Sequence, residues 1–415
     1  MRDQGSGPER EPDEAQRAAN IRESFREAFR SEADFVARAP GRVNIIGEHT
    51  DYNGGYVLPA AIDRTLLVAA KPMPGSRTVE LYSVNYDRWA SFDLDNIEPS
   101  TDKSQTWSNY VRAVAWALAD RGYIDVSAMH GAQLAIEGDV PRASGLSSSA
   151  AIEVASALTF TRLAGVEMGR VDLALVCQRA ENEFIGVKSG IMDQFISALG
   201  QADSALLIDT RSLAYEAVPL GLEEISYKLV VADSAVPRSL ITSAYNQRTV
   251  ECEQAVRILA PLLNLGRGAQ LRDISLAQLE EHKDALPEML YRRAHHVISE
   301  DDRTLRAAEL MRAGLGKDDN MAQFGKLLYA SHVSLRDDYE VSSPQLDMLV
   351  ELASEVPGVA GARMTGAGFG GCTVNIVQAR HLDEFQHHVI DQYRQRTGLD
   401  GKLYVCKAVE GGTYV

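Results

Sequence analysis

A glycine and three serines directly precede a helical pattern near the middle of the chain. Gly145 is followed by Ser147, Ser148 and Ser149, and apolar residues then recur at helical spacing over residues 152–164. The unpaired N–H groups and the dipole at a helix start attract anions, and small residues let an anion approach closely. We therefore expect this segment to bind phosphate. A helix capped by serine after a flexible turn is the alternative, although one serine would suffice for that.

Two known motifs built on a similar turn do not match this segment. A Walker A loop needs a lysine after its last glycine, and none follows Gly145. A nucleophile elbow has a second glycine where this chain has Ser149. An ordinary P-loop and a hydrolase are both disfavoured.

Carboxylates and a histidine gather in a second segment, residues 41–55. Glu48, His49 and Asp51 could bind a metal, but the chain has no second cluster of recognisable spacing. Carboxylates and imidazoles also bind sugar hydroxyls through paired hydrogen bonds. We therefore favour recognition of hydroxyl groups in this segment.

Four glycines lie in residues 366–371, which match the pattern Gly-x-Gly-x-x-Gly. A dinucleotide site requires a helix after this motif, but residues 372–377 are β-branched and strand-like. We therefore expect a tight turn between two strands, with glycines at positive φ. Their number suggests that the backbone closely approaches ligand phosphates or a domain interface.

The periodicity of the chain predicts an α+β protein whose second half is richer in helix. Pro40 should end a first strand, residues 190–195 should form a loop, and residues 211–225 should contain the domain boundary. The expected helices are 18–29, 107–121, 152–164, 171–184, 244–263, 288–313, 322–335, 345–356 and 382–396. The expected strands are 35–40, 66–70, 78–84, 131–137, 205–209, 229–232, 360–364, 372–377 and 403–408.

Composition limits the class of protein. A chain of 415 residues is long enough for two domains. Its net charge of −16 disfavours nucleic acid and anionic membranes as partners. The four cysteines form no Cys-x-x-Cys pair, the polar residues 1–17 resemble a disordered tail, and there is no signal peptide or membrane span, so we expect free buried thiols and a cytoplasmic protein. His295, His296 and the acidic residues 300–302 resemble a solvated helix end without function.

Taken together, the three segments resemble the galactokinases, members of the GHMP kinase superfamily. Residues 41–55 resemble the galactokinase signature, 141–151 the ATP loop and 364–372 the third motif, and the similarity runs from about residue 18 to the C-terminus. The resemblance implies an N-terminal domain like ribosomal protein S5 domain 2 over residues 18–215. It also implies a ferredoxin-like C-terminal domain over 216–415, with the active site between the two.

The resemblance also implies a reaction, in which MgATP phosphorylates the anomeric hydroxyl of α-D-galactose. Asp193 and Arg42 would flank that hydroxyl, with Asp193 as a base, or only an orienting anion, kept ionised by Arg42. The residues implied to contact the sugar are Glu48, His49, Asp51, Gly190, Asp193 and Tyr245. Those implied for the nucleotide are Gly145, Leu146, Ser147, Ser148, Ser149, Ala150 and, beside the adenine, Trp107. Mg²⁺ would be held by Ser149 and Glu181.

Two other functions remain open at this point. N-acetylgalactosamine kinases have a similar first motif, although Thr50 favours the galactose form. A galactose sensor without turnover would lose part of the serine and alanine loop, which is complete here. Ala143 replaces a glycine that is usual in the family, so the entry to the loop could be stiffer. The protein is expected to act as a monomer on galactose and ATP.

Overall fold

The computed structural model describes residues 13–141, 144–236 and 241–415. Ala143 and the first twelve residues of the expected N-terminal tail lie outside these ranges. Residues 14–17, also assigned to that tail, form the first turn of helix α1 (Glu14–Phe29). Asp13 accepts a hydrogen bond from the backbone N–H of Gln16, which caps the helix and explains its earlier start.

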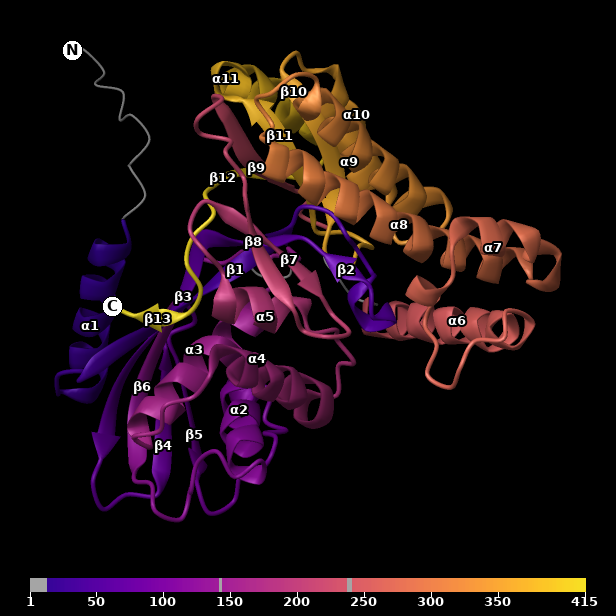
Figure 1. Ribbon diagram of the computed structural model, residues 1–415. Helices are drawn as coiled ribbons and strands as arrows, with labels where there is room; N and C mark the ends of the chain where they lie inside the picture. The colour runs from indigo at the N-terminus through magenta and orange to yellow at the C-terminus, as the bar shows by residue number, and fades with distance from the viewer. Residues whose placement is uncertain (1–12, 142–143, 237–240) are drawn as a thin grey trace, which may run out of the picture.

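A six-stranded sheet forms the main layer of the first half of the chain (Figure 1). Its order is β13-β1-β3-β6-β4-β5, with β4 and β6 parallel and the other neighbours antiparallel. The strands are β1 (Phe35–Asn44), β3 (Pro59–Met73), β4 (Thr78–Ser83), β5 (Arg88–Asp93), β6 (Gly131–Gly138) and β13 (Thr413–Tyr414).

Helices cover both faces of this sheet (Figure 1). On one face Val36 of β1 packs in a cluster with Ile21 and Phe25 of α1, whereas the next residue, Ala37, belongs to the main core on the other face. This alternation follows from the two-residue period of a strand. The second face carries α2 (Asn109–Asp120), α3 (Ser148–Leu163), α4 (Arg170–Arg179) and α5 (Met192–Leu199).

Two expectations for this half were wrong. Strand β1 continues through Pro40 to Asn44, because its register shifts between Pro40 and Arg42 and an irregular point of a ladder tolerates the missing N–H. The segment expected to be a loop at residues 190–195 contains the start of α5, so Asp193 lies in the first turn of a helix.

The second half contains a four-stranded antiparallel sheet of order β10-β11-β9-β12. Its strands are β9 (Tyr227–Asp233), β10 (Val359–Thr365), β11 (Cys372–Gln378) and β12 (Lys402–Cys406). Helices connect β9 to β10 and β11 to β12, which gives the βαββαβ arrangement of a ferredoxin-like domain. These helices include α8 (Glu288–Ala313), α9 (Asn320–Asp337), α10 (Pro344–Glu355), α11 (Leu382–Phe385) and α12 (Gln392–Thr397). The mixed α+β class is confirmed.

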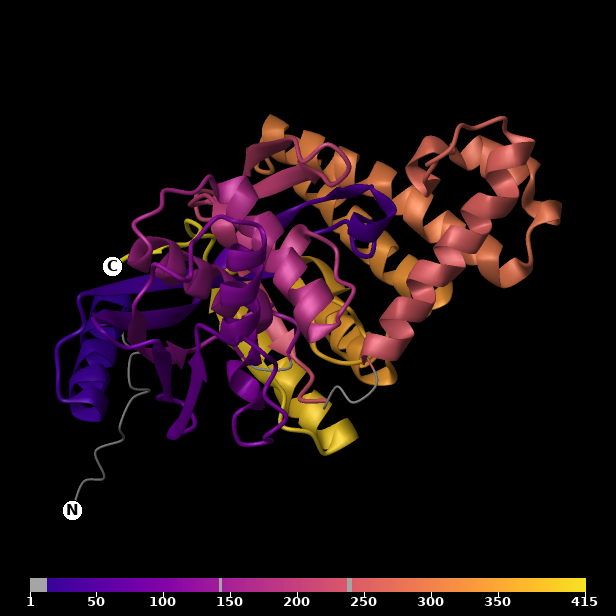
Figure 2. The ribbon, with the colours of Figure 1, turned by 90° about the horizontal axis from the view of Figure 1, so that it is seen from below.

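A smaller helical unit extends from the second half. Helices α6 (Ile241–Leu262) and α7 (Leu276–Glu281) project away from both sheets together with the N-terminal part of α8 (Figures 1 and 2). They pack around an apolar cluster that includes Leu259, Leu271 and Leu290 and continues to Leu335 of α9 and Met364 of β10. This cluster therefore joins the helical unit to the second half of the chain.

Strands from beyond residue 215 pair with strands from before it. A third sheet of order β2-β7-β8 joins β2 (Tyr56–Val57), β7 (Ser204–Asp209) and β8 (Tyr215–Pro219), and β13 pairs with β1. The segment 211–225 thus contains a strand of the smaller sheet. A division at residues 215 and 216 remains a prediction.

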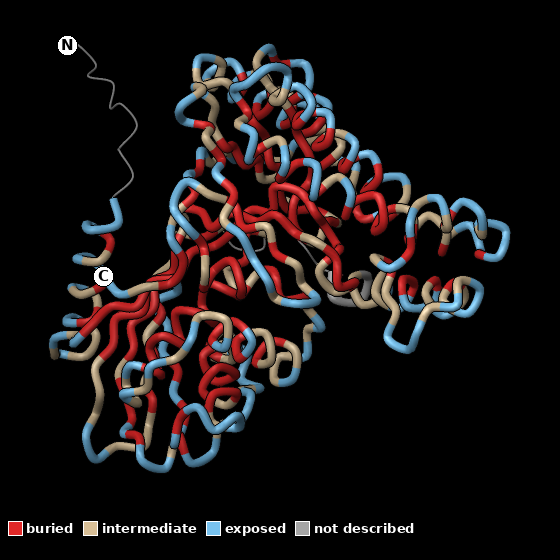
Figure 3. The backbone as a smooth tube through the Cα atoms, viewed as in Figure 1, coloured by how far each residue is buried: buried red, intermediate tan, exposed pale blue. Residues whose placement is uncertain are grey.

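The buried residues follow the two main sheets and the helices that face them, while the loops at the edges are exposed (Figure 3). All four cysteines are buried, as expected, and none forms a disulfide bond with another described residue. Within the described ranges, no helix has the length and apolar character needed to cross a membrane.

Candidate functional site

The serine segment leads into the start of α3, as expected. The helix begins at Ser148, and the preceding residue, Ser147, adopts a left-handed conformation with φ of 58°. The Ser147 side chain does not cap the helix but donates a hydrogen bond to Asp193 Oδ2. Since the first four N–H groups of a helix have no partner within it, those of this turn remain available to an anion. A simple serine cap does not explain the segment.

Strand β1 supports this serine turn through hydrogen bonds from Arg42. The Arg42 N–H donates to the Leu146 carbonyl at 3.0 Å, and the Arg42 guanidinium donates to the Gly145 carbonyl. A Cβ atom on Gly41 would lie 2.5 Å from the Leu146 carbonyl oxygen, so only glycine permits this approach. The turn is therefore held against the strand that leads to the second segment.

Arg42 and Asp193 form a forked ion pair beside the turn. Arg42 Nε lies 2.8 Å from Asp193 Oδ1, and Arg42 Nη2 lies 2.9 Å from Asp193 Oδ2. The arginine is buried, whereas 26% of the Asp193 side chain remains exposed. Three donors, counting Ser147, converge on this carboxylate, which suits an anion facing an open site.

A second carboxylate faces the other side of the turn. Glu181 lies in a π-helical turn (Ala180–Ile185) that continues α4, and such turns are frequent at functional sites. Its Oε2 atom accepts hydrogen bonds from Ser189 at 2.5 Å and from Gln194 at 2.8 Å. Burial raises the pKa of Glu181, as does the charge of Asp193, whereas a hydrogen bond from Ser149 opposes this effect.

Glu181 and Ser149 suit a magnesium ion that also binds phosphate and water. They do not suit an ion bound by protein ligands alone. Fully buried Glu153 shares the Gln194 amide with Glu181, and burial and the charge of Glu181 raise its pKa well above the ordinary value. Crowded carboxylates of this kind favour a cation nearby. The described part of the chain contains no group of three or more side chains able to hold a metal. Mg²⁺, however, typically takes one or two protein oxygens together with phosphate and water.

A cavity of about 230 Å³ opens at the serines. It extends from Ser148 and Ser149 to the rings of Trp107, Tyr110 and Tyr86. The Trp107 Nε1 atom is buried and has no hydrogen-bond partner in the described residues. Aromatic rings at one end and helix N–H groups at the other suit a nucleotide whose base lies beside Trp107.

Glu48 in the second segment is fixed by residues from the other half of the chain. Its carboxylate accepts a hydrogen bond of 2.7 Å from Arg363 of β10, which is fully buried. Glu300 of α8 accepts the N–H groups of Gly47 at 3.0 Å and of Glu48 at 3.2 Å. Burial raises the pKa of Glu48, although Arg363 and Arg42 oppose this effect.

Asp51, Gly190 and Tyr245 lie together near Asp193. A Cβ atom on Gly190 would lie 1.8 Å from Asp51 Oδ2, so the absence of a side chain allows the contact. Burial, followed by the charges of Asp193 and Glu48, raises the pKa of Asp51 to about 7. Tyr245 lies close enough for the charges of Asp51 and Asp193 to raise its own pKa, although burial is the main cause.

His49 lies inside an aromatic group. It has a positive φ of 63°, and its ring centroid lies 5.6 Å from that of Tyr245 and 5.0 Å from that of Tyr339. Burial lowers the pKa of His49 well below its ordinary value. The imidazole is therefore neutral at pH 7.

The third glycine-rich segment forms the expected turn between two antiparallel strands, β10 and β11. Positive φ values occur at Gly366, Gly368, Gly370 and Gly371. This turn lies against the second segment, because the Gly366 backbone hydrogen-bonds to the Glu48 carboxylate. The close backbone approach therefore includes a contact between the two halves of the chain.

Several residues of this site were not anticipated from the sequence. The expectation of a solvated helix end at residues 295–302 was wrong for His296 and Glu300, which are fully buried. His296 Nε2 lies 3.0 Å from the Glu48 carbonyl, and Glu300 binds the N–H groups described above. Arg363 was missed although it directly precedes the third motif. A buried arginine and glutamate within helical and strand patterns give no signal without knowledge of their partners.

The sequence-predicted residues thus fall into connected groups. Arg42 and Asp193 join the turn of Gly145, Leu146, Ser147, Ser148, Ser149 and Ala150 to the rest of the site. Glu181 lies beside Ser149, and Trp107 lines the same cavity as Ser149. Asp51 contacts Gly190, and the charges of Asp193 and Glu48 raise the pKa of Asp51.

Three family models match the chain in order. The galactokinase galactose-binding signature matches residues 23–72, the GHMP kinase N-terminal domain residues 109–201, and the GHMP kinase C-terminal domain residues 308–395. Together they cover more than half of the chain, including residues 41–55 and the serine turn.

Curated relatives and solved structures agree with these matches. A galactokinase of Roseiflexus sp. (strain RS-1) is 46% identical over 94% of this chain and 95% of its own length. A galactokinase of Chloroflexus aurantiacus is 47% identical over 94% and 95%. The crystal structure of Lactococcus lactis galactokinase complexed with galactose superposes with a TM-score of 0.87 at 37% identity, covering 96% of this chain and 99% of that one. A Methanococcus jannaschii mevalonate kinase shares only the fold, with a TM-score of 0.63 at 20% identity. The chain belongs to the galactokinase family of the GHMP kinases.

Proposed function

We propose that this ATP-dependent sugar kinase transfers the γ-phosphate of MgATP to the anomeric hydroxyl of α-D-galactose, giving galactose 1-phosphate and ADP. The observation that carries the proposal is the Arg42–Asp193 pair, which lies between the phosphate-binding turn and the group of Glu48, His49 and Asp51. Phosphoryl transfer depends mainly on positioning and on neutralising charge. A carboxylate and a guanidinium between the two substrates meet both needs.

The nucleotide is proposed to bind with its triphosphate on the N–H groups from Gly145 to Ala150 and its base beside Trp107. Ser149 and Glu181 are the side chains that would hold Mg²⁺. When bound, the ion would neutralise phosphate charge and help to orient the transferred group. Arg42 supplies further positive potential close to the turn.

Asp193 is proposed as the group that accepts the proton of the anomeric hydroxyl. Glu48, His49, Asp51, Gly190 and Tyr245 are proposed to bind the remaining hydroxyls. The Asp193 carboxylate already accepts hydrogen bonds from Arg42 and Ser147, so an orienting role for Asp193 is the alternative. Asp193→Asn distinguishes the two, because loss of a base should lower kcat by ~10² to 10⁴. A near-normal kcat would exclude Asp193 as the base.

Arg42→Ala should lower kcat by ~10² to 10³ if Arg42 stabilises negative charge in the transition state.

Phosphorus NMR tests the reaction itself. Purified protein with MgATP receives galactose, glucose, N-acetylgalactosamine or mevalonate in separate samples, with Asp193→Ala as control. A sugar 1-phosphate signal with galactose, absent in the control, is the expected result. A signal with N-acetylgalactosamine instead would favour the amino-sugar kinase. No product, combined with a higher melting temperature in galactose, would favour a sensor.

Cellular location and assembly remain predictions. The cytoplasm and a monomeric state are proposed from the sequence. Cell fractionation and light scattering on the purified chain test them. A dimer at micromolar concentration would contradict the monomer.

A further inference from the structure

We propose that a hydrogen-bonded chain from Cys252 through Tyr339 and Tyr52 to His49 holds the His49 imidazole with its proton on Nε2, so that His49 donates a hydrogen bond to the sugar. Tyr52, Tyr339 and Cys252 are then positioning residues that act through His49. The inference rests on the proposed function for its ligand, a hydroxylated sugar.

The geometry of the chain is continuous. His49 Nδ1 lies 2.8 Å from the Tyr52 hydroxyl oxygen, which lies 2.8 Å from the Tyr339 hydroxyl oxygen. The Tyr339 hydroxyl lies 3.3 Å from Cys252 Sγ, within the range of a hydrogen bond to sulfur. Tyr339 and Cys252 are fully or almost fully buried, so bulk water does not compete along this part of the chain.

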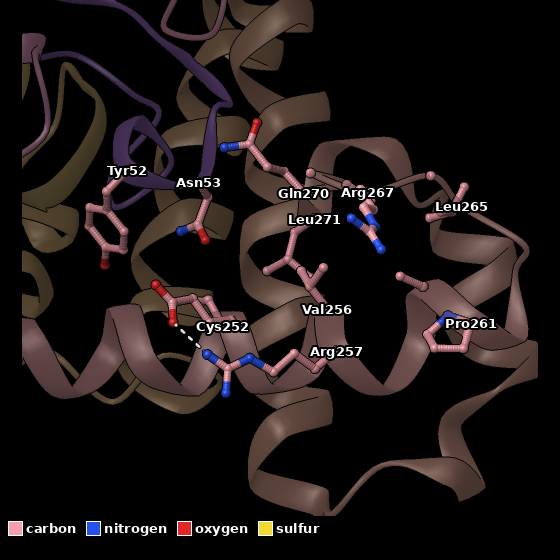
Figure 4. Close-up of a pocket in the computed structure, with 15 residues that line it drawn as sticks. Tyr52, Asn53, Cys252, Val256, Arg257, Pro261, Leu265, Arg267, Gln270 and Leu271 are labelled. Carbon is pink, nitrogen blue, oxygen red and sulfur yellow. Dashed lines mark hydrogen bonds and ion pairs between the residues drawn. The ribbon is translucent and has the colours of Figure 1, made fainter.

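Three separate parts of the protein supply these residues. His49 and Tyr52 belong to the second segment, Cys252 lies on α6, and Tyr339 follows α9. Figure 4 shows Tyr52 and Asn53 extending from their loop toward α6, on the wall of an open cavity of about 530 Å³. The Asn53 side chain also donates to the His49 carbonyl at 2.9 Å, which fixes the loop from its other side. The contacts therefore order both the backbone and the ring of His49.

The direction of the protons follows from donor and acceptor strength. Each tyrosine hydroxyl has one proton, so all the hydrogens along the chain point either toward His49 or toward Cys252. An imidazole nitrogen is a good acceptor and a thiol sulfur a weak one. Asn53 already hydrogen-bonds to the Cys252 sulfur through its side chain. The favoured arrangement runs from the Cys252 S–H to Tyr339, then to Tyr52, and ends at His49 Nδ1.

The other imidazole nitrogen, Nε2, is left for the ligand. His49 Nε2 is buried and forms no hydrogen bond with any described residue. The Ala367 backbone acts to raise the pKa of His49, but the larger effect of burial lowers it. Because Nδ1 accepts the Tyr52 hydrogen in this arrangement and burial keeps His49 neutral, the single proton of the imidazole is on Nε2.

Nitrogen NMR of the full-length protein labelled with ¹⁵N-histidine tests the tautomer directly. The His49 signals are assigned by their loss in His49→Gln among the nine histidines of the chain. In the protein without ligands we expect Nδ1 to have the shift of an unprotonated nitrogen and Nε2 that of an N–H. The reverse pattern, or a charged imidazolium at pH 7, would overturn the proposal.

Kinetics of Tyr52→Phe test whether the chain serves sugar binding. Removing the hydroxyl leaves Nδ1 without its donor and allows the proton to occupy either nitrogen. We expect KM for galactose to rise roughly three- to tenfold, as for loss of one hydrogen bond, with kcat within about twofold. In the NMR experiment the same variant should lose the pure Nε2–H pattern. An unchanged KM or an unchanged tautomer would contradict the proposal.

Matched variants separate positioning from general packing. Tyr393→Phe removes another buried hydroxyl, which donates to the Ser234 carbonyl just after β9, and should leave the KM for galactose unchanged. Cys252→Ser retains a donor and should preserve the tautomer, whereas Cys252→Ala should weaken the preference. If the wild type phosphorylates no sugar, the proposed function fails, while the tautomer measurement still decides the present proposal.

Discussion

Asp51 should destabilise the protein in the absence of sugar, and Asp51→Asn should therefore stabilise it. The side chain is half-buried beside Gly190, near the negative charges of Asp193 and Glu48. Asparagine has almost the same shape and keeps one oxygen for the backbone N–H groups of Tyr52 and Met192 that bind Asp51. The substitution thus removes the charge with little change in packing.

The pKa of Asp51 sets the size of the effect. It rises from 3.8 to about 7. Each pH unit corresponds to ~1.36 kcal/mol, so the upper limit of the destabilisation is ~4 kcal/mol. The side chain keeps some contact with water, which screens the charges, and we expect a gain of ~1 to 2 kcal/mol in the free energy of unfolding.

The dependence on pH identifies the cause. Between pH 3.8 and about 7 the folded protein keeps a proton on Asp51 that the unfolded chain has lost. The contribution of Asp51 to the free energy of unfolding therefore falls as pH rises through this window and is constant above it. The advantage of Asp51→Asn should be small at pH 4.5 and largest at pH 8.

Guanidinium unfolding of both proteins at pH 4.5 and pH 8, without galactose or nucleotide, measures this difference. The other titrating groups are shared by the two proteins and cancel in the comparison. Galactose affinity should change in the opposite sense, with a loss of ~10- to 100-fold because a charged acceptor is removed. An equal stability difference at both pH values would refute the argument that repulsion and burial of this carboxylate cause the strain.

Two further substitutions test how the site is held. Arg363→Met leaves the Glu48 carboxylate buried without its partner and should lower the free energy of unfolding by ~3 to 5 kcal/mol, with Arg363→Lys recovering part of the loss. A loss below about 1 kcal/mol in guanidinium unfolding would argue against this role of Arg363. Gly190→Ala places a Cβ atom against Asp51 and should lower kcat/KM for galactose by ~10²-fold in a steady-state assay, whereas Gly266→Ala, at a position with open space, should have no effect.

The sequence predicted the parts of the site that depend on local patterns. The start of α3 at the serines follows from composition and helical spacing, and the helix expected at residues 288–313 has the bounds Glu288 and Ala313 in the structure. The continuation of β1 through Pro40 could not be predicted locally, because it depends on the neighbouring strands. β13 pairs with β1 only at Ala37 and Arg38, so the missing N–H of Pro40 costs no ladder bond on that side.

Residues that act across long separations escaped the sequence analysis for a different physical reason. Glu300 binds the N–H of Gly47 although 253 positions separate them, and Arg363 binds Glu48 across 315 positions. The sequence predicts that Glu300 of α8 belongs to an acidic, solvated stretch, because helical spacing alone does not show which face of a helix packs against the rest of the protein. Only the position of the second segment against α8 and β10 shows that these charges are buried and paired.

These long-range contacts also explain why so many polar residues can face one small site. Burying Glu48, His49 and Asp51 together is unfavourable, because each side chain loses water and the two carboxylates repel each other. Glu300 binds the N–H groups before the loop turns, Arg363 neutralises Glu48, and the chain through Tyr52 holds His49. Asp51 has no such cationic partner among the residues described, and its pKa rises to about 7. The strain is thus concentrated on the side chain proposed to bind the sugar, where new hydrogen bonds from hydroxyl groups would relieve it.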